Sequence, residues 1–161
     1  MSDEVHIRQL KAKSKSDINL WLLAITFTLF TFIIAVNPSL VKNNVFLSLQ
    51  LTLAIPFLSS SIFARTRLGY SEQPATWDLY GFITFILAYG FLVNVVGILL
   101  STLVSTTIGL IFWIVNMLSA LCYSLLEVIE DKAKTRSRFY KDIVFILIIL
   151  LAGIFPVFGL Y

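Results

Sequence analysis

Residues 79–126 read LYGFITFILAYGFLVNVVGILLSTLVSTTIGLIFWIVNMLSALCYSLL, a stretch of 48 residues without a charged residue or a proline. A single helix of that length would extend about 72 Å. The hydrocarbon core of a bilayer is only about 30 Å thick, so the chain must turn within the stretch. The polar place for a turn is STLVSTT at residues 101–107. The stretch therefore predicts two membrane-spanning helices, at 79–100 and 107–126.

Three further apolar stretches are close to the length of about 20 residues that a helix needs to cross a bilayer. They lie at residues 18–36, 45–64 and 143–161. Hydrophobic residues make up 58% of the chain and charged residues only 13%, whereas a soluble domain carries roughly a quarter charged residues. The sequence thus predicts an all-α, polytopic integral membrane protein. We expect one domain of five transmembrane helices, residues 18–161, after a basic segment of residues 1–17.

The charged residues lie almost entirely on one side of the predicted spans. Eleven of the 12 Lys and Arg residues, and all nine acidic residues, fall within residues 1–17, 65–78 and 127–142, while Lys42 alone lies on the other side. Basic residues in short loops stay in the cytoplasm. We therefore expect the N-terminus inside and the C-terminus outside, with loops 65–78 and 127–142 cytoplasmic. The plasma (inner) membrane is the expected location.

Neutral polar residues recur at helical spacing in the third and fourth spans. Asn94 and Asn116 each lie eleven residues from Ser105, so an antiparallel helix pair would hold them at nearly the same depth. A hydrogen bond between helices there would contribute about 0.6 to 2 kcal/mol. The pair could be a packing clasp, part of the lining of a polar path or cavity, or a contact for self-association. The predicted packing faces are Gly90, Asn94, Gly97 and Ser101, and Gly109, Asn116, Ser119, Ala120 and Tyr123.

The first and second spans carry similar faces, and the second contains a proline. The expected packing residues are Ala24, Thr28, Thr31 and Ala35 on the first span, and Gln50, Ala54, Phe57 and Ser61 on the second. Pro56 has no N–H and leaves the Thr52 carbonyl without its helical partner. Pro56 is therefore a candidate kink, which is either a gate or a bend that neighbouring helices tolerate.

Charged residues next to the spans have two predicted roles. Asp17, Asp78 and Asp142 each immediately precede a span, where a carboxylate can cap the free N–H groups of a helix. The loop at 127–142 carries a basic stretch that either contacts anionic lipid headgroups or only sets the orientation. This basic stretch consists of Lys132, Lys134, Arg136, Arg138 and Lys141.

The sequence argues against an enzyme. The only histidine, His6, lies before the first span, and no lysine, histidine or acid is present within the spans to activate a serine or Cys122. The seven glycines are scattered and form no phosphate-binding loop. We therefore expect no catalytic residue, cofactor or metal site, and no nucleic-acid partner.

Two functions are compatible with this pattern. The first is a small multi-pass membrane subunit, oligomeric with itself, that acts as an anchor, scaffold or sensor for cytoplasmic proteins through loops 65–78 and 127–142. An assembly for transport, secretion or cell defence would suit such a subunit. The second is a pore or facilitator for ions or uncharged small solutes, lined by intramembrane Asn, Ser and Thr and gated near Pro56.

Overall fold

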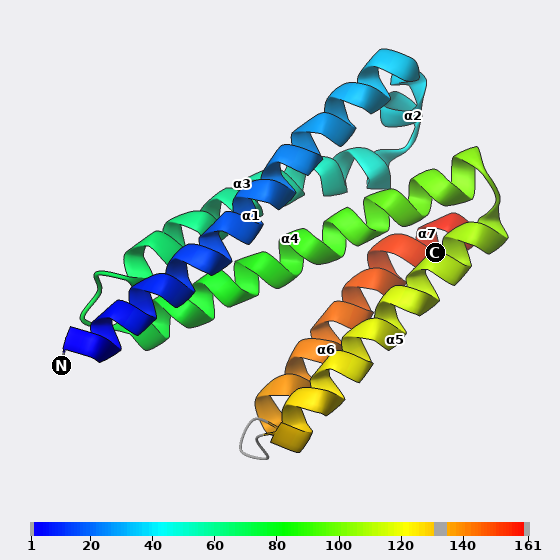
Figure 1. Cartoon of the computed structure of the whole chain (residues 1–161). Coiled ribbons are helices and arrows are strands. Elements are labelled where there is room, and N and C mark those ends of the chain that lie inside the picture. Colours follow the sequence, from blue (N-terminus) through cyan, green and yellow to red (C-terminus); the bar gives the residue numbers. More distant parts are fainter. Residues whose placement is uncertain (1, 131–134, 160–161) are drawn as a thin grey trace. The chain divides into compact units, whose positions relative to one another are not determined.

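A computed structural model describes residues 2–130 and 135–159, with backbone only for residues 2–5, 8 and 135–138 (Figure 1). The elements in these ranges are all helices, and five are long and apolar enough to cross a membrane. The prediction of an all-helical chain with five membrane-length helices is therefore confirmed. The five apolar helices are Gln9–Val36, Val45–Leu68, Pro74–Leu103, Thr106–Glu130 and Phe139–Phe158.

The helices follow one another with short connections. The described elements are α1 (Ser2–Val36), α2 (Pro38–Asn43), α3 (Val45–Leu68), α4 (Pro74–Leu103), α5 (Thr106–Glu130), α6 (Thr135–Ile149), the π-helix η2 (Leu150–Ile154) and α7 (Phe155–Phe158). Two residues, Val104 and Ser105, connect α4 to α5, so the connection is shorter than residues 101–106, which the predicted spans leave between them. The Ser105 hydroxyl accepts a hydrogen bond from the Ile108 N–H at 3.2 Å and caps α5.

The chain forms two compact units, Met1–Tyr89 and Gly90–Tyr161, which divide within α4. In the first unit, α1 and α3 lie side by side (Figure 1). The buried positions of α1 recur every seven residues, which gives a narrow packing stripe like that of a coiled coil. This stripe consists of Ala12, Asn19, Thr26 and Ile33.

The face predicted for the first span is wrong, because Ala24, Thr28, Thr31 and Ala35 are all exposed. Thr28 donates to the Ala24 carbonyl of its own helix at 2.9 Å, so its hydroxyl needs no neighbouring helix. The face predicted for the second span is largely right. Gln50, Ala54 and Ser61 of α3 are buried, and Phe57 is partly buried.

In the second unit, the later part of α4 packs closely on α5. A Cβ on Gly97 would overlap the Trp113 indole, and a Cβ on Gly109 would overlap the Ser101 hydroxyl. Both contacts pair residues that are equally distant from Ser105, so they fix the register of this antiparallel helix pair. The face predicted for α5 is only partly right. Gly109 is buried, but Ser119 and Tyr123 are exposed, and the other buried residues of α5 are Trp113 and Ser124.

The predicted aspartate caps are wrong, because the helices begin earlier than the apolar stretches do. Asp17 lies in the middle of α1, and Asp78 lies four residues after the start of α4 at Pro74. Asp142 lies within α6 and accepts a hydrogen bond from the Ser124 hydroxyl of α5 at 2.7 Å. The longer helices also shorten the loop between α3 and α4 to residues 69–73.

The last apolar segment is not a uniform α-helix. After Ile149 the hydrogen bonding becomes that of a π-helix, Leu150–Ile154, which contains the buried Gly153. The π-helix is followed by the short helix α7, which is capped by Gly159. The φ of Gly159 is 64°, in the left-handed region that favours glycine. Short π-helical segments of this kind are frequently found at functional sites.

Candidate functional site

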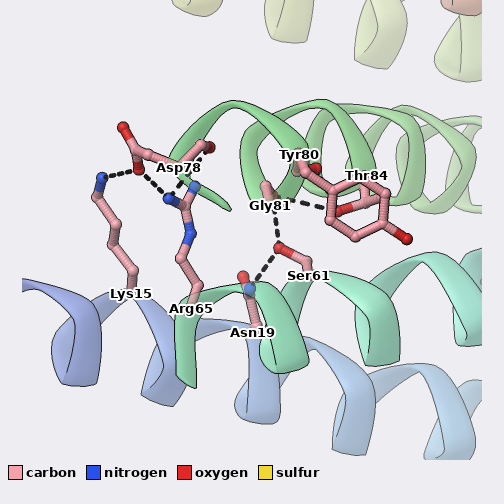
Figure 2. A network of polar contacts seen from close by, with 8 residues as sticks. All are labelled: Lys15, Asn19, Ser61, Arg65, Asp78, Tyr80, Gly81 and Thr84. Atoms are coloured by element: carbon pink, nitrogen blue, oxygen red, sulfur yellow. Dashed lines mark hydrogen bonds and ion pairs between the residues drawn. The ribbon is translucent and has the colours of Figure 1, made fainter. Parts of the chain in front are cut away.

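Charged side chains of three helices meet in the first unit. The buried guanidinium of Arg65 on α3 forms an ion pair with the Asp78 carboxylate on α4, and the same carboxylate oxygen is 3.1 Å from Lys15 Nζ on α1 (Figure 2). Asp78 remains half exposed, with 49% of its side chain accessible, while Arg65 is only 5% accessible. Two cations thus share one carboxylate, which joins α1, α3 and α4 by charge.

A chain of neutral hydrogen bonds lies next to this ion pair (Figure 2). The Asn19 amide of α1 donates to the Ser61 hydroxyl of α3 at 2.8 Å, and Ser61 donates to the Gly81 carbonyl of α4 at 2.7 Å. Ser61 and Asn19 are both buried. Because Ser61 both accepts and donates, one hydroxyl connects the three helices.

Gly81 allows α4 to lie close to α3 at this point. A Cβ there would be 2.9 Å from the Ala64 Cβ and 3.3 Å from Arg65 Nε. Thr84, one turn further along α4, donates to the Tyr80 carbonyl at 2.9 Å. The polar side chains of this cluster therefore bond within the packed helices. We name Lys15, Asn19, Ser61, Arg65, Asp78 and Gly81 the three-helix polar cluster.

In the second unit, Asn94 of α4 is fully buried. Its amide nitrogen donates to the Ile148 carbonyl of α6 at 3.0 Å, just before the π-helix begins. Asn116 of α5 is partly buried and donates to the Phe112 carbonyl of its own helix at 2.9 Å. The register of α4 and α5 puts the two asparagines at the same level, but their amides donate to different helices. Asn94 thus connects α4 to α6.

Two buried polar atoms in this region have no hydrogen-bond partner among the described residues. They are the amide oxygen of Asn94, Oδ1, and the indole nitrogen of Trp113. Gly153 of η2 is close to both, since a Cβ built on it would overlap the Asn94 amide and lie 3.0 Å from Trp113 Nε1. The Ser101 hydroxyl, on the same face of α4, is likewise buried without a partner in the described chain.

The remaining predicted site residues lie apart from these two groups. Pro56 is exposed and lies inside α3, which continues on both sides of it. Lys132 and Lys134 fall outside the described residues, and Arg136 and Arg138 are described in backbone only, within α6. Lys141 is partly buried in the same helix.

Sequence reasoning missed the three-helix polar cluster. The charge pattern predicts a loop at Arg65, yet the buried spacing of Leu58, Ser61, Arg65 and Leu68 continues the α-helical period through it. Asn19 lies seven residues before Thr26, the spacing of the buried stripe on α1. These two periodicities are the sequence signals that indicate burial of Arg65 and Asn19. The contacts with Asp78 and Gly81 depend on the pairing of distant helices, which one sequence does not reveal.

The chain matches no known family model, no curated protein and no solved structure.

Proposed function

We propose that the protein is a non-enzymatic membrane subunit that holds cytoplasmic partner proteins at the plasma (inner) membrane through its charged end. The observation that carries this proposal is the length of α1. Its 35 residues extend about 52 Å, whereas the hydrocarbon core is about 30 Å thick. The excess lies at the N-terminal end of the helix, where Lys11, Lys13 and Lys15 are exposed. A basic helix end that extends beyond the bilayer would offer partners a surface attached to the membrane domain.

The use of the neutral polar residues supports a scaffold more than a pore. Asn19, Ser61 and Asn94 hydrogen-bond between packed helices. Such bonds stabilise helix association in membranes. A polar path through the membrane would instead need side chains that face water along the whole span.

We also propose that two copies of the protein associate through one face of α5. On α5, Asn116 is partly buried, Ser119 and Tyr123 are exposed, and all three share one helix face. The Ser119 hydroxyl is a polar group that would otherwise face lipid. A second copy packed on this face would cover it.

Purification from native membranes in a mild detergent tests the proposed function. Lys13→Glu reverses an exposed charge on the N-terminal part of α1, and Lys42→Glu makes the same change on α2, on the other side of the predicted membrane. We expect cytoplasmic proteins to copurify with the wild type and with Lys42→Glu, and to be depleted at least severalfold with Lys13→Glu. Equal recovery with both variants would contradict a docking role for the N-terminal part of α1.

A further inference from the structure

The last membrane-length helix changes its hydrogen bonding at a point that Asn94 of α4 contacts. The Asn94 amide donates to the Ile148 carbonyl at 3.0 Å, just before the π-helix η2 begins. Within η2, Gly153 packs directly against the same amide, because a Cβ built on Gly153 would overlap it. Asn94 therefore contacts the helix both before and inside the segment in which the hydrogen bonding changes.

Full burial of the last helix ends at Gly153. Ile149, the final residue of α6, is fully buried, and Gly153 is the buried residue of η2. The residues that the structure describes after it, 154–159, are all partly or largely exposed. The packing of Gly153 against Asn94 is thus the last fully buried contact before the short helix α7.

The backbone of the last helix is also weakest at this point. In η2 the Phe155 N–H donates to the Leu150 carbonyl, five residues earlier, and π-helical turns of this kind are rare insertions in α-helices. Pro156 follows and has no N–H, so it cannot continue the hydrogen bonding of either helix type. Helices change direction sharply at prolines and at π-helical insertions. The combination is typical of a hinge.

We propose that η2 is a hinge and that Asn94 is the latch that holds it, so that residues 155–159 rotate relative to α6 when the contact with Asn94 is lost. In water, this motion would be opposed by exposure of the apolar side chains Phe155, Val157 and Phe158. In a bilayer it is not, because lipid tails are as apolar as these side chains. Loss of one hydrogen bond between membrane helices should raise the released fraction roughly 3- to 30-fold.

Pulsed electron paramagnetic resonance of the protein in nanodiscs tests the hinge. Cys122 of α5 is the only cysteine and is exposed, and Phe158→Cys adds a second exposed position for a spin label. We expect a single narrow distribution of distances between the two labels. Addition of Asn94→Leu should broaden this distribution or add a second distance. An unchanged distribution in the folded Asn94→Leu protein, or an equally broad one without that change, would overturn the proposal.

Two controls distinguish a hinge from general loosening of the helices. Asn116→Leu removes an amide that donates to its own helix, and it should leave the distribution narrow. A broadening as large as that of Asn94→Leu would contradict the role of Asn94. With the second label at Leu147→Cys, an exposed position of α6 before η2, Asn94→Leu should leave the distance to Cys122 unchanged. A shift there would mean that the whole helix moves, which contradicts a hinge at η2.

A second variant tests the latch if Asn94→Leu does not fold. Gly153→Ala keeps the Asn94 side chain but adds a methyl group that would overlap its amide. We expect the same broadening between the labels at Cys122 and Phe158→Cys. A distribution that stays narrow in Gly153→Ala would show that the contact of Gly153 with Asn94 does not hold the end of the helix.

Discussion

The buried guanidinium of Arg65 forms an ion pair with the half-exposed carboxylate of Asp78, and this pair connects α3 to α4. Desolvating a cation is costly unless an anion compensates it, so the contact constrains how the two helices pack. Lys15 of α1 reaches the same carboxylate from its exposed side. The two cations are therefore not equivalent, and substitutions should separate their contributions.

Asp78→Asn should destabilise the fold by about 2 kcal/mol, because it leaves Arg65 buried without a counter-charge. The expected cost is below the 3–5 kcal/mol typical of breaking a fully buried pair, since half of the Asp78 side chain is exposed. Lys15→Ala is the control and should cost about 1 kcal/mol or less, as exposed pairs do. Unfolding in mixed micelles with increasing denaturing detergent measures both. Equal losses would mean that burial of Arg65 is not what makes the pair important.

Ser61→Ala should destabilise the protein by about 1–2 kcal/mol, because it removes the hydroxyl that joins Asn19 to the Gly81 carbonyl. Ser59→Ala is the matched control, since Ser59 donates only to the Ile55 carbonyl of its own helix. The same unfolding measurement applies. The double variant Ser61→Ala with Asn19→Ala should lose less stability than the sum of the losses of the two single variants, because both changes break one chain of hydrogen bonds. Full additivity would contradict that connection.

Gly97→Ala should cost about 1–3 kcal/mol, because the added methyl group would overlap the Trp113 indole and force α4 away from α5. Gly69→Ala should change stability by less than about 1 kcal/mol. The nearest atoms to the added Cβ would be 3.6 and 3.7 Å away, and the φ of −67° at Gly69 suits any residue. Thermal unfolding in detergent compares the two variants. A neutral Gly97→Ala would show that the register of α4 and α5 differs from the one described.

The orientation of the chain predicts opposite labelling of two introduced cysteines. Cys122 is the only cysteine, so Cys122→Ser gives a background in which Ser39→Cys in α2 and Glu72→Cys before α4 can be compared. Both positions are exposed. A membrane-impermeant maleimide should label Ser39→Cys in intact cells and Glu72→Cys only after permeabilisation. The reverse pattern would place the charged side outside.

The sequence predicts five membrane-length helices, and residues 79–126 count as two of them because a single helix over this uncharged stretch would be more than twice as long as the hydrocarbon core is thick. It predicted the packing faces less well, and Thr28 explains why. Small and hydroxylated residues suit close packing, but Thr28 bonds to its own helix and can face lipid. Asn19 has a longer amide side chain that reaches Ser61 of the neighbouring helix. Which face is buried thus depends on partners distant in the chain.

The predicted aspartate caps are wrong for a related reason. Apolar stretches mark where a helix can enter a bilayer, not where the helix begins, and α4 begins four residues before Asp78. Free of a capping role, Asp78 interacts with cations of two other helices. The π-helix at Leu150–Ile154 had no signal beyond Gly153 and Pro156, because glycine and proline mark weak points without specifying the hydrogen bonding that replaces the α-helix.

Flux through liposomes that contain the purified protein tests most directly whether the intramembrane polar residues serve packing in a scaffold. Ion conductance and the entry of small uncharged solutes are measured for the wild type, for the double variant Asn94→Leu with Asn116→Leu, and for protein-free vesicles. If these residues serve packing in a scaffold, neither protein gives flux above that of protein-free vesicles. Wild-type flux that the folded double variant loses would contradict it and establish a pore.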